Sequence, residues 1–466
     1  MGIRTKDLSK IGYTNNVARS LAINITGKFC KHETKEQILA TLVEVQESPE
    51  KFRDSEIWFP LVEHFAPTLS DTLPFTVYNL RNEALPYKTY GNKCIDSQAK
   101  QQMDLAMRLP VAMAGALMPD AHAGYGLPIG GVLAVENAVI PYAVGVDIGC
   151  RMSLSVFDAK ADFLKRYSHQ IKTALGDYTH FGMEGGLPFL QEHEVLDRDE
   201  FALTPLLRKL REKAIRQLGT SGGGNHFVEF GDIQLYENNV LHLPAGTYIA
   251  LLSHSGSRGL GAEIAKKYST VAREQCKLPR EAQHFAWLDL DTEAGQEYWM
   301  SMNLAGDYAR ACHEQIHANL SKALGLKVIA NVSNHHNFAW KEEISSGRNA
   351  IVHRKGATPA AKGQAGFIPG SMATAGYLVC GTGEAEALNS ASHGAGRAMS
   401  RQSAKEQFTR SEMKKILTRA GVSLIGGSIE EIPLAYKDIE KVMPAQDTLV
   451  EIHGRFMPRI VRMNKE

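Results

Sequence analysis

Residues 247–261 read TYIALLSHSGSRGLG, an apolar run that leads into His254 and then into a glycine-rich turn. The same alternation of a short β-like run with a glycine-rich turn recurs from Met118 onward. The other runs are GGVLAV at 130–135, KVIANVS at 327–333, NAIVHRK at 349–355, GYLVCG at 376–381 and TLVEIH at 448–453. Helical patterns separate only some of these runs, without a regular βαβ order. The sequence therefore predicts an α+β fold with mixed sheets and surrounding helices.

Five segments carry the apolar spacing or the end signals of helices. Near the N-terminus, Thr34 and Gln37 form the pattern of a capping box, which predicts a helix from Lys35 to about Glu47. The other predicted helices cover residues 96–109, 204–216, 308–324 and 404–419. Prolines at positions 49, 60, 67 and 74 interrupt the chain after the first helix. We therefore expect a partly helical N-terminal extension over residues 1–74 and a second domain over residues 75–466.

The composition is that of a globular protein. Of 466 residues, 44% are apolar, which suffices for a packed core. Lys and Arg number 52 against 51 acidic residues, so a nucleic acid could be held only by a local cationic patch. No apolar run reaches the roughly 18 residues of a membrane span. Six scattered cysteines without a CxxC pair, and a start without an apolar leader, predict a cytoplasmic protein in a reducing compartment.

Several common motifs of nucleotide-binding proteins and hydrolases are missing. The sequence has no GxxxxGK[ST], and no GxGxxG stands between a clear strand and a helix. HExxH and GxSxG are missing as well. If this chain handles nucleotides, it uses another device.

Metal-ligating residue types recur at the ends of apolar runs or in glycine-rich turns. These residues are Asp147 and Cys150 in AVGVDIGCR, His226 in GTSGGGNHFVEF, His254 in LLSHSGSRGLG, and His335 and His336 in IANVSNHHN. Each one alone has an ordinary alternative, such as a buried cysteine beside a turn aspartate or a hydrogen-bonded core histidine. Their recurrence favours a metal site, because divalent transition ions select clustered His, Cys and Asp. The ligand types suit zinc, iron or manganese equally.

The C-terminal half adds residues suited to a phosphate. These are His353, Arg354 and Lys355 in HRKGA, Gly370, Ser371 and Thr374 in IPGSMAT, and His393, Arg397 and Arg401 in SHGAGRAMSR. Small residues around His393 would let a phosphate approach its ring, and guanidinium groups can hold phosphate oxygens bidentately. The alternative for the last motif is a glycine-rich helix start with solvated arginines.

Taken together, the motifs resemble one family. They are MPDAHAGYGLPIGG at 118–131, GVDIGC, GGGNHFVE, HSGSRGLG, HHN, HRKGA, IPGSM, SHGAGRAMSR and EIPLAYKDI. In this order, from about Phe75 almost to the C-terminus, they are similar to the RtcB-type RNA-splicing ligases. That family joins an RNA 3′-phosphate or 2′,3′-cyclic phosphate to a 5′-hydroxyl, using GTP and manganese. The resemblance therefore implies an RtcB-like fold with a metal and nucleotide cleft, broken or cleaved RNA as the substrate, and no membrane partner.

The resemblance also implies roles for individual residues. His393 corresponds to the histidine that becomes guanylylated. The ligands of the manganese ions, two per active site, would be Asp147, Cys150, His226, His254 and His336. Contacts to GMP would come from Asn225, Phe227, Glu229, His336, Asn337, Gly370, Ser371, Met372, Gly394, Ala395 and Gly396. The Glu229 carboxylate would suit the N1–H and N2–H donors of guanine. The cations that contact RNA or phosphate would be Arg258, Arg354, Lys355, Arg397 and Arg401.

Two features depart from the family pattern. Members typically end in Val-Lys-Gly, and their lysine contacts the nucleotide, whereas this chain ends in IVRMNKE with Lys465 about one place away. Residues 1–74 have no counterpart in the simple family pattern. Both features suggest a specialised branch, for RNA repair rather than tRNA splicing.

Two other functions remain to be weighed against an RNA ligase. A dinuclear metal phosphohydrolase acting on RNA ends would use the same ligands but would not need His393 in a phosphate-sized glycine pocket. A non-catalytic protein that binds RNA ends would fit the altered C-terminus but not the intact set of ligands.

Overall fold

The computed structural model describes residues 3–30, 32–52, 55, 57–65, 75–160, 162–182, 184–344 and 347–465. The chain divides into two compact units, Met1–Phe75 and Thr76–Glu466, which we call the N-terminal and the C-terminal unit. Pro67 and Pro74, which suggested the domain boundary, lie outside the described residues.

The N-terminal unit is a small helical unit with its own core. Its helices are α1 (Thr5–Lys10), α2 (Asn16–Phe29), α3 (Lys35–Glu47) and α4 (Phe59–Phe65), with a 3-10 turn at Pro49–Phe52. The predicted capping box at the start of α3 is confirmed, because Thr34 accepts from the Gln37 backbone while the Gln37 side chain accepts from that of Thr34. Buried Leu8, Leu42 and Leu61 pack into the core of this unit.

Two large sheets form the C-terminal unit. The larger sheet has eight strands in the order β11-β6-β8-β7-β19-β16-β15, with β18 paired to β19. The smaller has five in the order β12-β13-β4-β3-β2. The strands of the larger sheet are β6 (Arg151–Phe157), β7 (Phe227–Leu235), β8 (Gly246–Ser255), β11 (Val328–His335), β15 (Ala365–Ile368), β16 (Gly376–Gly381), β18 (Ser423–Gly427) and β19 (Val450–Lys465). Those of the smaller sheet are β2 (Lys88–Thr89), β3 (Ala112–His122), β4 (Ile129–Val135), β12 (Asn337–Glu343) and β13 (Asn349–Lys355).

Three short strand pairs complete the sheets. They are β1 (Thr76–Val77) with β9 (Cys276–Lys277), β5 (Ala138–Val139) with β10 (Leu288–Asp289), and β14 (Ala357–Pro359) with β17 (Ser390–Ser392). Most neighbouring strands of the two large sheets are antiparallel; β18–β19 and β2–β3 are parallel. This arrangement confirms the predicted α+β fold.

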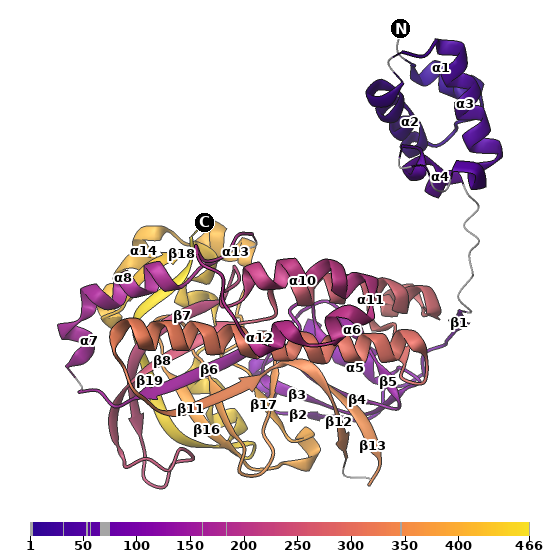
Figure 1. The fold of residues 1–466 in the computed structure, drawn as a ribbon. Helices are drawn as coiled ribbons and strands as arrows, with labels where there is room; N and C mark the ends of the chain where they lie inside the picture. The colour runs from indigo at the N-terminus through magenta and orange to yellow at the C-terminus, as the bar shows by residue number, and fades with distance from the viewer. Residues whose placement is uncertain are drawn as a thin grey trace. The chain divides into compact units, whose positions relative to one another are not determined.

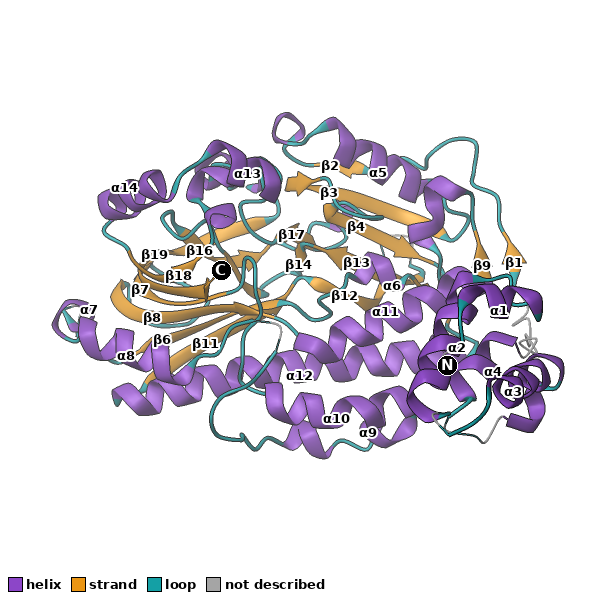
Figure 2. Cartoon of the chain, turned by 90° about the horizontal axis from the view of Figure 1, so that it is seen from above, coloured by secondary structure: helices purple, strands orange, loops and turns teal. Residues whose placement is uncertain are grey.

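Helices lie along the two large sheets (Figures 1 and 2). They are α5 (Ser97–Met107), α6 (Pro141–Val144), α7 (Phe163–Arg166), α8 (Ser168–Tyr178), α9 (Glu200–Leu203), α10 (Pro205–Gln217), α11 (Arg258–Gln275), α12 (Glu293–Leu324), α13 (Arg401–Gln407), α14 (Arg410–Ala420) and α15 (Ile439–Val442). Figure 1 shows α10, α11 and α12 stacked over one side of the strands. Helix α12 has 32 residues, and small buried residues such as Ala305 and Gly306 along its length allow close packing.

The predicted elements differ from the observed ones at three places. The glycine-rich turn predicted after His254 is short, because helix α11 already begins at Arg258. The pattern at 308–324 marks only the second half of α12, which begins earlier, at Glu293. The segment 404–419, predicted as one helix, contains the end of α13 and most of α14. The break occurs because Thr409 caps the start of α14 in a capping box with Glu412, which replaces continuous helical hydrogen bonds there.

Candidate metal and nucleotide site

The strand register brings the five predicted metal ligands to one end of the larger sheet. Arg151, which follows Cys150, pairs with Ser255 at the end of β8, and Phe227, which follows His226, pairs with His254. The last residue of β11, His335, pairs with Arg151 as well. Because these neighbouring strands run antiparallel, the starts of β6 and β7 meet the ends of β8 and β11. Segments that are far apart in sequence therefore converge at a single edge.

The donor atoms of this cluster lie within contact of one another. The Cys150 sulfur lies 3.2 Å from His254 Nε2 and 3.5 Å from His226 Nε2. His254 Nε2 lies 3.2 Å from His336 Nε2, and His226 Nε2 lies 3.0 Å from Asp147 Oδ2. Two groups of three ligands result, Cys150 with His254 and His336, and Cys150 with Asp147 and His226. A shared thiolate suits a pair of neighbouring divalent cations.

Burial keeps three of these side chains, His254, His336 and Cys150, in their neutral forms. Burial lowers the pKa of His254 to about 3 and that of His336 well below its usual value, so both imidazoles are neutral at pH 7. Burial, together with the charge of Asp147, raises the pKa of the Cys150 thiol well above its usual value. A bound cation would have to displace the thiol proton, as metals do when they bind cysteine.

The surroundings of the ligands fit a metal site. His254 Nδ1 donates a hydrogen bond of 3.0 Å to the backbone oxygen of Asn225. The proton is thereby held on Nδ1, and the lone pair of Nε2 points into the cluster. Gly256 lies against Asp147, where a Cβ atom would come within 2.0 Å of Oδ1. The site thus combines a fixed imidazole tautomer with a backbone cradle for the carboxylate.

His393 lies beside this cluster and is held by a carboxylate that our sequence prediction missed. Its ring centroid is 5.0 Å from that of His336. Its Nδ1 donates a hydrogen bond of 2.6 Å to Oδ2 of Asp120, a fully buried residue on β3. The His393 backbone N–H donates to the same oxygen at 3.1 Å. Since Nδ1 carries the proton, Nε2 keeps a free lone pair. Asp120 lies in the motif MPDAHAGYGLPIGG that carries the family resemblance, but the sequence prediction gave it no role.

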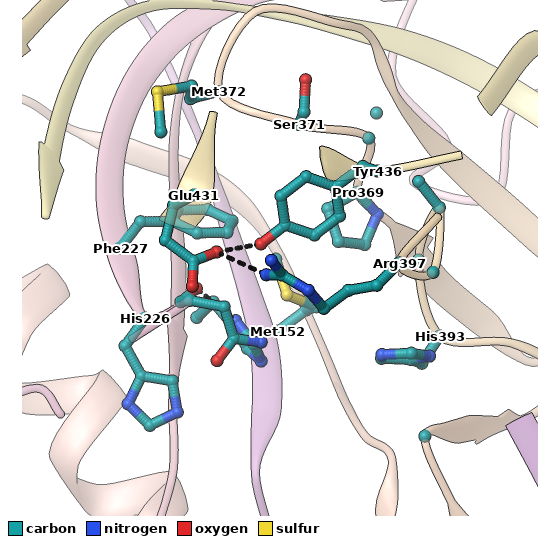
Figure 3. Close-up of a pocket in the computed structure, with 18 of the residues that line it drawn as sticks. Met152, His226, Phe227, Pro369, Ser371, Met372, His393, Arg397, Glu431 and Tyr436 are labelled. Carbon is teal, nitrogen blue, oxygen red and sulfur yellow. Dashed lines mark hydrogen bonds and ion pairs between the residues drawn. The ribbon is translucent and has the colours of Figure 1, made fainter. Parts of the chain in front are cut away.

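A cavity of about 340 Å³ joins the ligand cluster to His393 (Figure 3). The predicted residues that line it are Asp147, Cys150, Asn225, His226, Phe227, Glu229, His254, His336, Asn337, Gly370, Ser371, Met372, Thr374, His393, Gly394, Ala395, Gly396, Arg397 and Arg401. His122, Glu431 and Tyr436 also line it, although the sequence prediction gave them no role. Figure 3 shows Tyr436 and Arg397 reaching the carboxylate of Glu431 inside the cavity.

Glu229 is a buried carboxyl group in the wall of this cavity. It lies on β7, and its residue is 4% exposed. Burial raises its pKa well above the usual value. The carboxyl group therefore favours its neutral form until a ligand offers hydrogen-bond donors to it.

Arg354 is not the RNA contact that we predicted. Its side chain is 1% exposed, and its guanidinium donates at 2.7 and 2.8 Å to the two carboxylate oxygens of Glu342. It also donates to Ser390 Oγ and to the backbone oxygen of Leu388. With these contacts made inside the protein, the guanidinium is out of reach of a phosphate and ties β13 to its surroundings.

The other predicted residues outside the cavity lining are His335, His353, Lys355, Arg258 and Lys465. His335 Nδ1 accepts from the Arg151 guanidinium at 2.8 Å, and His353 Nε2 accepts from the backbone N–H of Ile140 at 2.9 Å. Lys355 is buried and donates to the backbone oxygens of Tyr125 and Tyr142. Arg258 is also buried, and its guanidinium donates to Thr220 Oγ1 and to the backbone oxygen of Gly182. Lys465 is exposed at the end of β19.

Known proteins match most of the C-terminal unit. The sequence pattern of the family described as tRNA-splicing ligase RtcB matches residues 101–205 and 197–464. The RNA-splicing ligase RtcB of Escherichia coli K12 is 30% identical over 403 residues, covering 80% of this chain and 96% of the relative. The tRNA-splicing ligase RtcB of Nanoarchaeum equitans is 30% identical over 454 residues, covering 80% of this chain and 94% of the relative. The tRNA-splicing ligase RtcB of Thermococcus kodakarensis is 27% identical over 439 residues, covering 77% of this chain and 90% of the relative.

Among the described residues, no helix combines the length and the apolar character that a membrane span needs. The residues matched by the family pattern include all of those that line the cavity. The chain belongs to the RtcB family.

Proposed function

We propose that this protein is a GTP- and manganese-dependent RNA ligase that joins a 3′-phosphate or 2′,3′-cyclic phosphate end to a 5′-hydroxyl end through a histidine–GMP intermediate. The observation that carries the proposal is the position of His393. Its ring faces the same cavity as the donor cluster, and its Nδ1 donates a hydrogen bond of 2.6 Å to Asp120 Oδ2. A histidine with a fixed tautomer and a free Nε2 is suited to nucleophilic attack.

The donor cluster would hold two manganese ions, one between Cys150, His254 and His336 and the other between Cys150, Asp147 and His226. When bound, manganese supplies positive charge that neutralises phosphate oxygens and polarises the phosphorus. The residues themselves do the rest of the positioning. Asn225 fixes the tautomer of His254, and Gly256 leaves space for the Asp147 carboxylate.

His393 would carry the nucleotide in two transfers. In the first, Nε2 attacks the α-phosphorus of GTP, an N–P bond forms, and the bond to pyrophosphate breaks. The Nδ1 proton stays on the imidazole, where the Asp120 carboxylate stabilises the positive charge that develops. In the second, an RNA 3′-phosphate oxygen attacks the same phosphorus and the N–P bond breaks, which returns His393 to its neutral form. A cyclic phosphate would first be hydrolysed to the 3′-phosphate.

The final step joins the two RNA ends. The 5′-hydroxyl oxygen attacks the activated 3′-phosphate, GMP leaves, and the hydroxyl proton is released. Arg397 and Arg401 line the cavity and would bind phosphate oxygens. Both guanidinium groups also contact Glu431, which holds them at the cavity wall.

Glu229 would select guanine. An ionised carboxylate accepts from N1–H and N2–H of guanine, whereas adenine has no donor at the equivalent ring nitrogen. In the buried wall of the cavity, a carboxylate left without these donors is strongly disfavoured. The preference for GTP over ATP would therefore come from the cost of an unpaired charge.

The test is to incubate the protein with manganese and GTP labelled at the α-phosphate, and to look for an acid-labile protein adduct. We expect wild type to form it, His393→Ala to lose it, and His169→Ala, which removes an exposed histidine on α8, to keep it. RNA ends dephosphorylated without any adduct would instead identify a phosphohydrolase. Binding of RNA ends with neither adduct nor turnover would identify a non-catalytic binding protein.

A further inference from the structure

The loop between β3 and β4, residues 123–128, forms part of the rim of the cavity. The residues on either side of it, His122 and Ile129, both line the cavity. Tyr125 lies three residues after His122, so its Cα is within roughly 11 Å of that of His122. Unlike the cavity residues, Tyr125 is 73% exposed. An aromatic side chain thus stands in solvent next to the mouth of the proposed active site.

The backbone of this loop is held firmly at three successive residues. Gly124 donates to Gln102 Oε1 at 3.0 Å, and its own oxygen accepts from the same side chain. The Tyr125 oxygen accepts from Lys355. Gly126 has a φ of +70° and lies so close to His284 that a Cβ would come within 3.2 Å of its Cβ. The exposed ring is therefore carried by an ordered support.

Tyr125 is one of three neighbouring rings. The His284 and Tyr142 rings stack with centroids 4.7 Å apart and planes 29° apart. The Tyr125 ring meets His284 edge-on, with centroids 6.4 Å apart. We call Tyr125, His284 and Tyr142 the aromatic platform. Val146, which is exposed and directly precedes Asp147, extends the apolar surface from Tyr142 and α6 toward the metal ligands.

Two basic side chains accompany the aromatic platform, the exposed Arg273 and the buried Lys355, whose pKa burial lowers to about 7. Lys355 Nζ lies 5.2 Å from the centroid of the Tyr142 ring and donates to its backbone oxygen at 3.1 Å. Arg273 is exposed in the last turn of α11. Burial lowers the pKa of His284, and Arg273 and Lys355 lower it further. An exposed aromatic ring such as Tyr125, with an exposed cation such as Arg273 nearby, is a feature with which proteins bind unpaired nucleic-acid strands.

We propose that the aromatic platform binds an unpaired nucleobase of the RNA, close to the end being joined, by stacking on Tyr125. The proposal rests on the proposed ligase function, which brings an RNA end into the adjacent cavity. Stacking suits any base, since every base presents a π-face, so the platform would hold RNA ends without reading their sequence. Lys355 then acts as a positioning residue, because its two backbone contacts hold the platform rather than a phosphate.

Binding and joining of single-stranded RNA by Tyr125 variants test this proposal. Base–aromatic stacking contributes about 1–3 kcal/mol per base, so Tyr125→Ala should weaken RNA binding by roughly 5- to 150-fold. Tyr125→Phe and Tyr125→Trp, which keep a ring, should restore it. Fluorescence anisotropy of labelled RNA with the holoenzyme measures the affinity. Tyr236→Ala removes another exposed tyrosine, beyond the end of β7, and should bind RNA like wild type.

An abasic nucleotide supplies the decisive comparison. Removing one base near the 3′-phosphate end, or near the 5′-hydroxyl end in a second set of RNAs, should weaken binding to wild type but not weaken it further in Tyr125→Ala. The strand that shows this non-additivity is the one that stacks. Equal affinity of wild type and Tyr125→Ala, or fully additive losses with both strands, would overturn the proposal.

The guanylylation assay separates this proposal from the ligase function. Adduct formation needs no RNA, so Tyr125→Ala should form the adduct at the rate of wild type. If the variant loses the adduct, the loop belongs to the nucleotide site and the stacking proposal is wrong. If wild type itself forms no adduct, the ligase function fails first. Because Tyr125 is largely exposed, we expect the same urea unfolding midpoint for wild type and variant.

Discussion

At the scale of single residues, the chemistry of the cavity depends on a few buried groups whose protons are fixed by neighbours. Asp120 is the main example, since its Oδ2 accepts from both the ring and the backbone of His393. Burial alone would raise the pKa of this carboxyl group, but its interactions with His393 and Lys437 bring it below the usual value. Asp120 is therefore ionised and can stabilise a cationic imidazole.

Asp120→Asn should preserve the shape of the pocket but abolish most guanylylation. An amide carries no charge and can present a donor to Nδ1, which moves the imidazole proton to the attacking nitrogen. By comparison with other orienting carboxylates, we expect a loss of about 10²- to 10⁴-fold in the rate of adduct formation. Quenched-flow measurement of the labelled adduct gives the rate. GTP affinity measured without RNA is the control and should be unchanged. A rate within threefold of wild type would contradict the role of Asp120.

If Glu229 binds guanine as proposed, GMP affinity should depend on pH. Burial raises the pKa of the free carboxyl group, whereas guanine would bind the ionised form, so binding would release a proton. GMP affinity should rise with pH up to the raised pKa, and fall about tenfold per unit of pH below it. Calorimetry in two buffers of different ionisation enthalpy counts the proton. Glu229→Gln should remove the pH dependence and lower the GMP affinity by about 10- to 100-fold. A Glu229→Gln variant that still releases a proton would identify another titrating group.

At the scale of elements, packing of β8 on α12 determines where the candidate metal ligand His254 lies. A chain of hydrogen bonds of 2.6–3.1 Å runs from Asn331 through Ser155, His317, Ser253 and His313 to the backbone oxygen of Ser255. Burial lowers the pKa of His317 to about 3 and that of His313 well below its usual value. Each neutral ring then donates from one nitrogen and accepts at the other, which gives the chain a single direction. Because Ser253 and Ser255 face α12, His254 between them faces the cavity.

The turn after β8 should be as sensitive as the ligands themselves. In Gly256→Ala, the new Cβ would lie 2.0 Å from Asp147 Oδ1 and force the carboxylate out of the cluster. We expect the affinity for Mn²⁺ to fall by about 10- to 100-fold, as when the support of a ligand is lost. Titration followed by electron paramagnetic resonance measures free Mn²⁺.

Gly176→Ala is the matched control for this change. Gly176 lies in α8 with no heavy atom within 4 Å of an added Cβ. The substitution should leave Mn²⁺ affinity unchanged and raise the free energy of unfolding by roughly 0.5–1 kcal/mol through helix propensity. If Gly256→Ala binds Mn²⁺ as tightly as Gly176→Ala does, Asp147 is not a ligand.

At the scale of the whole molecule, the proposed catalytic residues all belong to one unit. The five candidate ligands, Asp120 and His393 lie within Thr76–Glu466, and the matched family pattern begins at residue 101. The N-terminal unit has a separate core formed by residues such as Leu8 and Leu42. Because this unit carries its own core, we predict that the chemistry does not need it and that any contribution it makes concerns the choice of RNA.

Removing the N-terminal unit tests this division. A chain of residues 76–466 should form the histidine–GMP adduct within about twofold of the full-length rate, because independent units retain their local stability. The ratio of joining rates on broken tRNA and broken ribosomal RNA should change. An unchanged ratio would count against a role in substrate choice, whereas loss of the adduct would assign residues 1–75 to the catalytic machinery.

The sequence by itself determined the fold class, the family and the types of residue at the ends of the strands. These follow from local information, because apolar runs, glycine-rich turns and polar residues at their ends are each readable within about ten positions. Thr34 and Gln37 also predicted the start of α3 correctly, since a capping box is a contact between residues three apart.

Only the tertiary structure decided which of these residues meet. Asp120 and His393 are 273 positions apart, and no local pattern marks their contact. Arg354 and Lys355 are neighbours in a basic motif, yet strand packing buries one against Glu342 and turns the other toward the loop that carries Tyr125. The physical reason is that charge and residue type are local properties, whereas burial and partners depend on strand register and on the layers packed against each face.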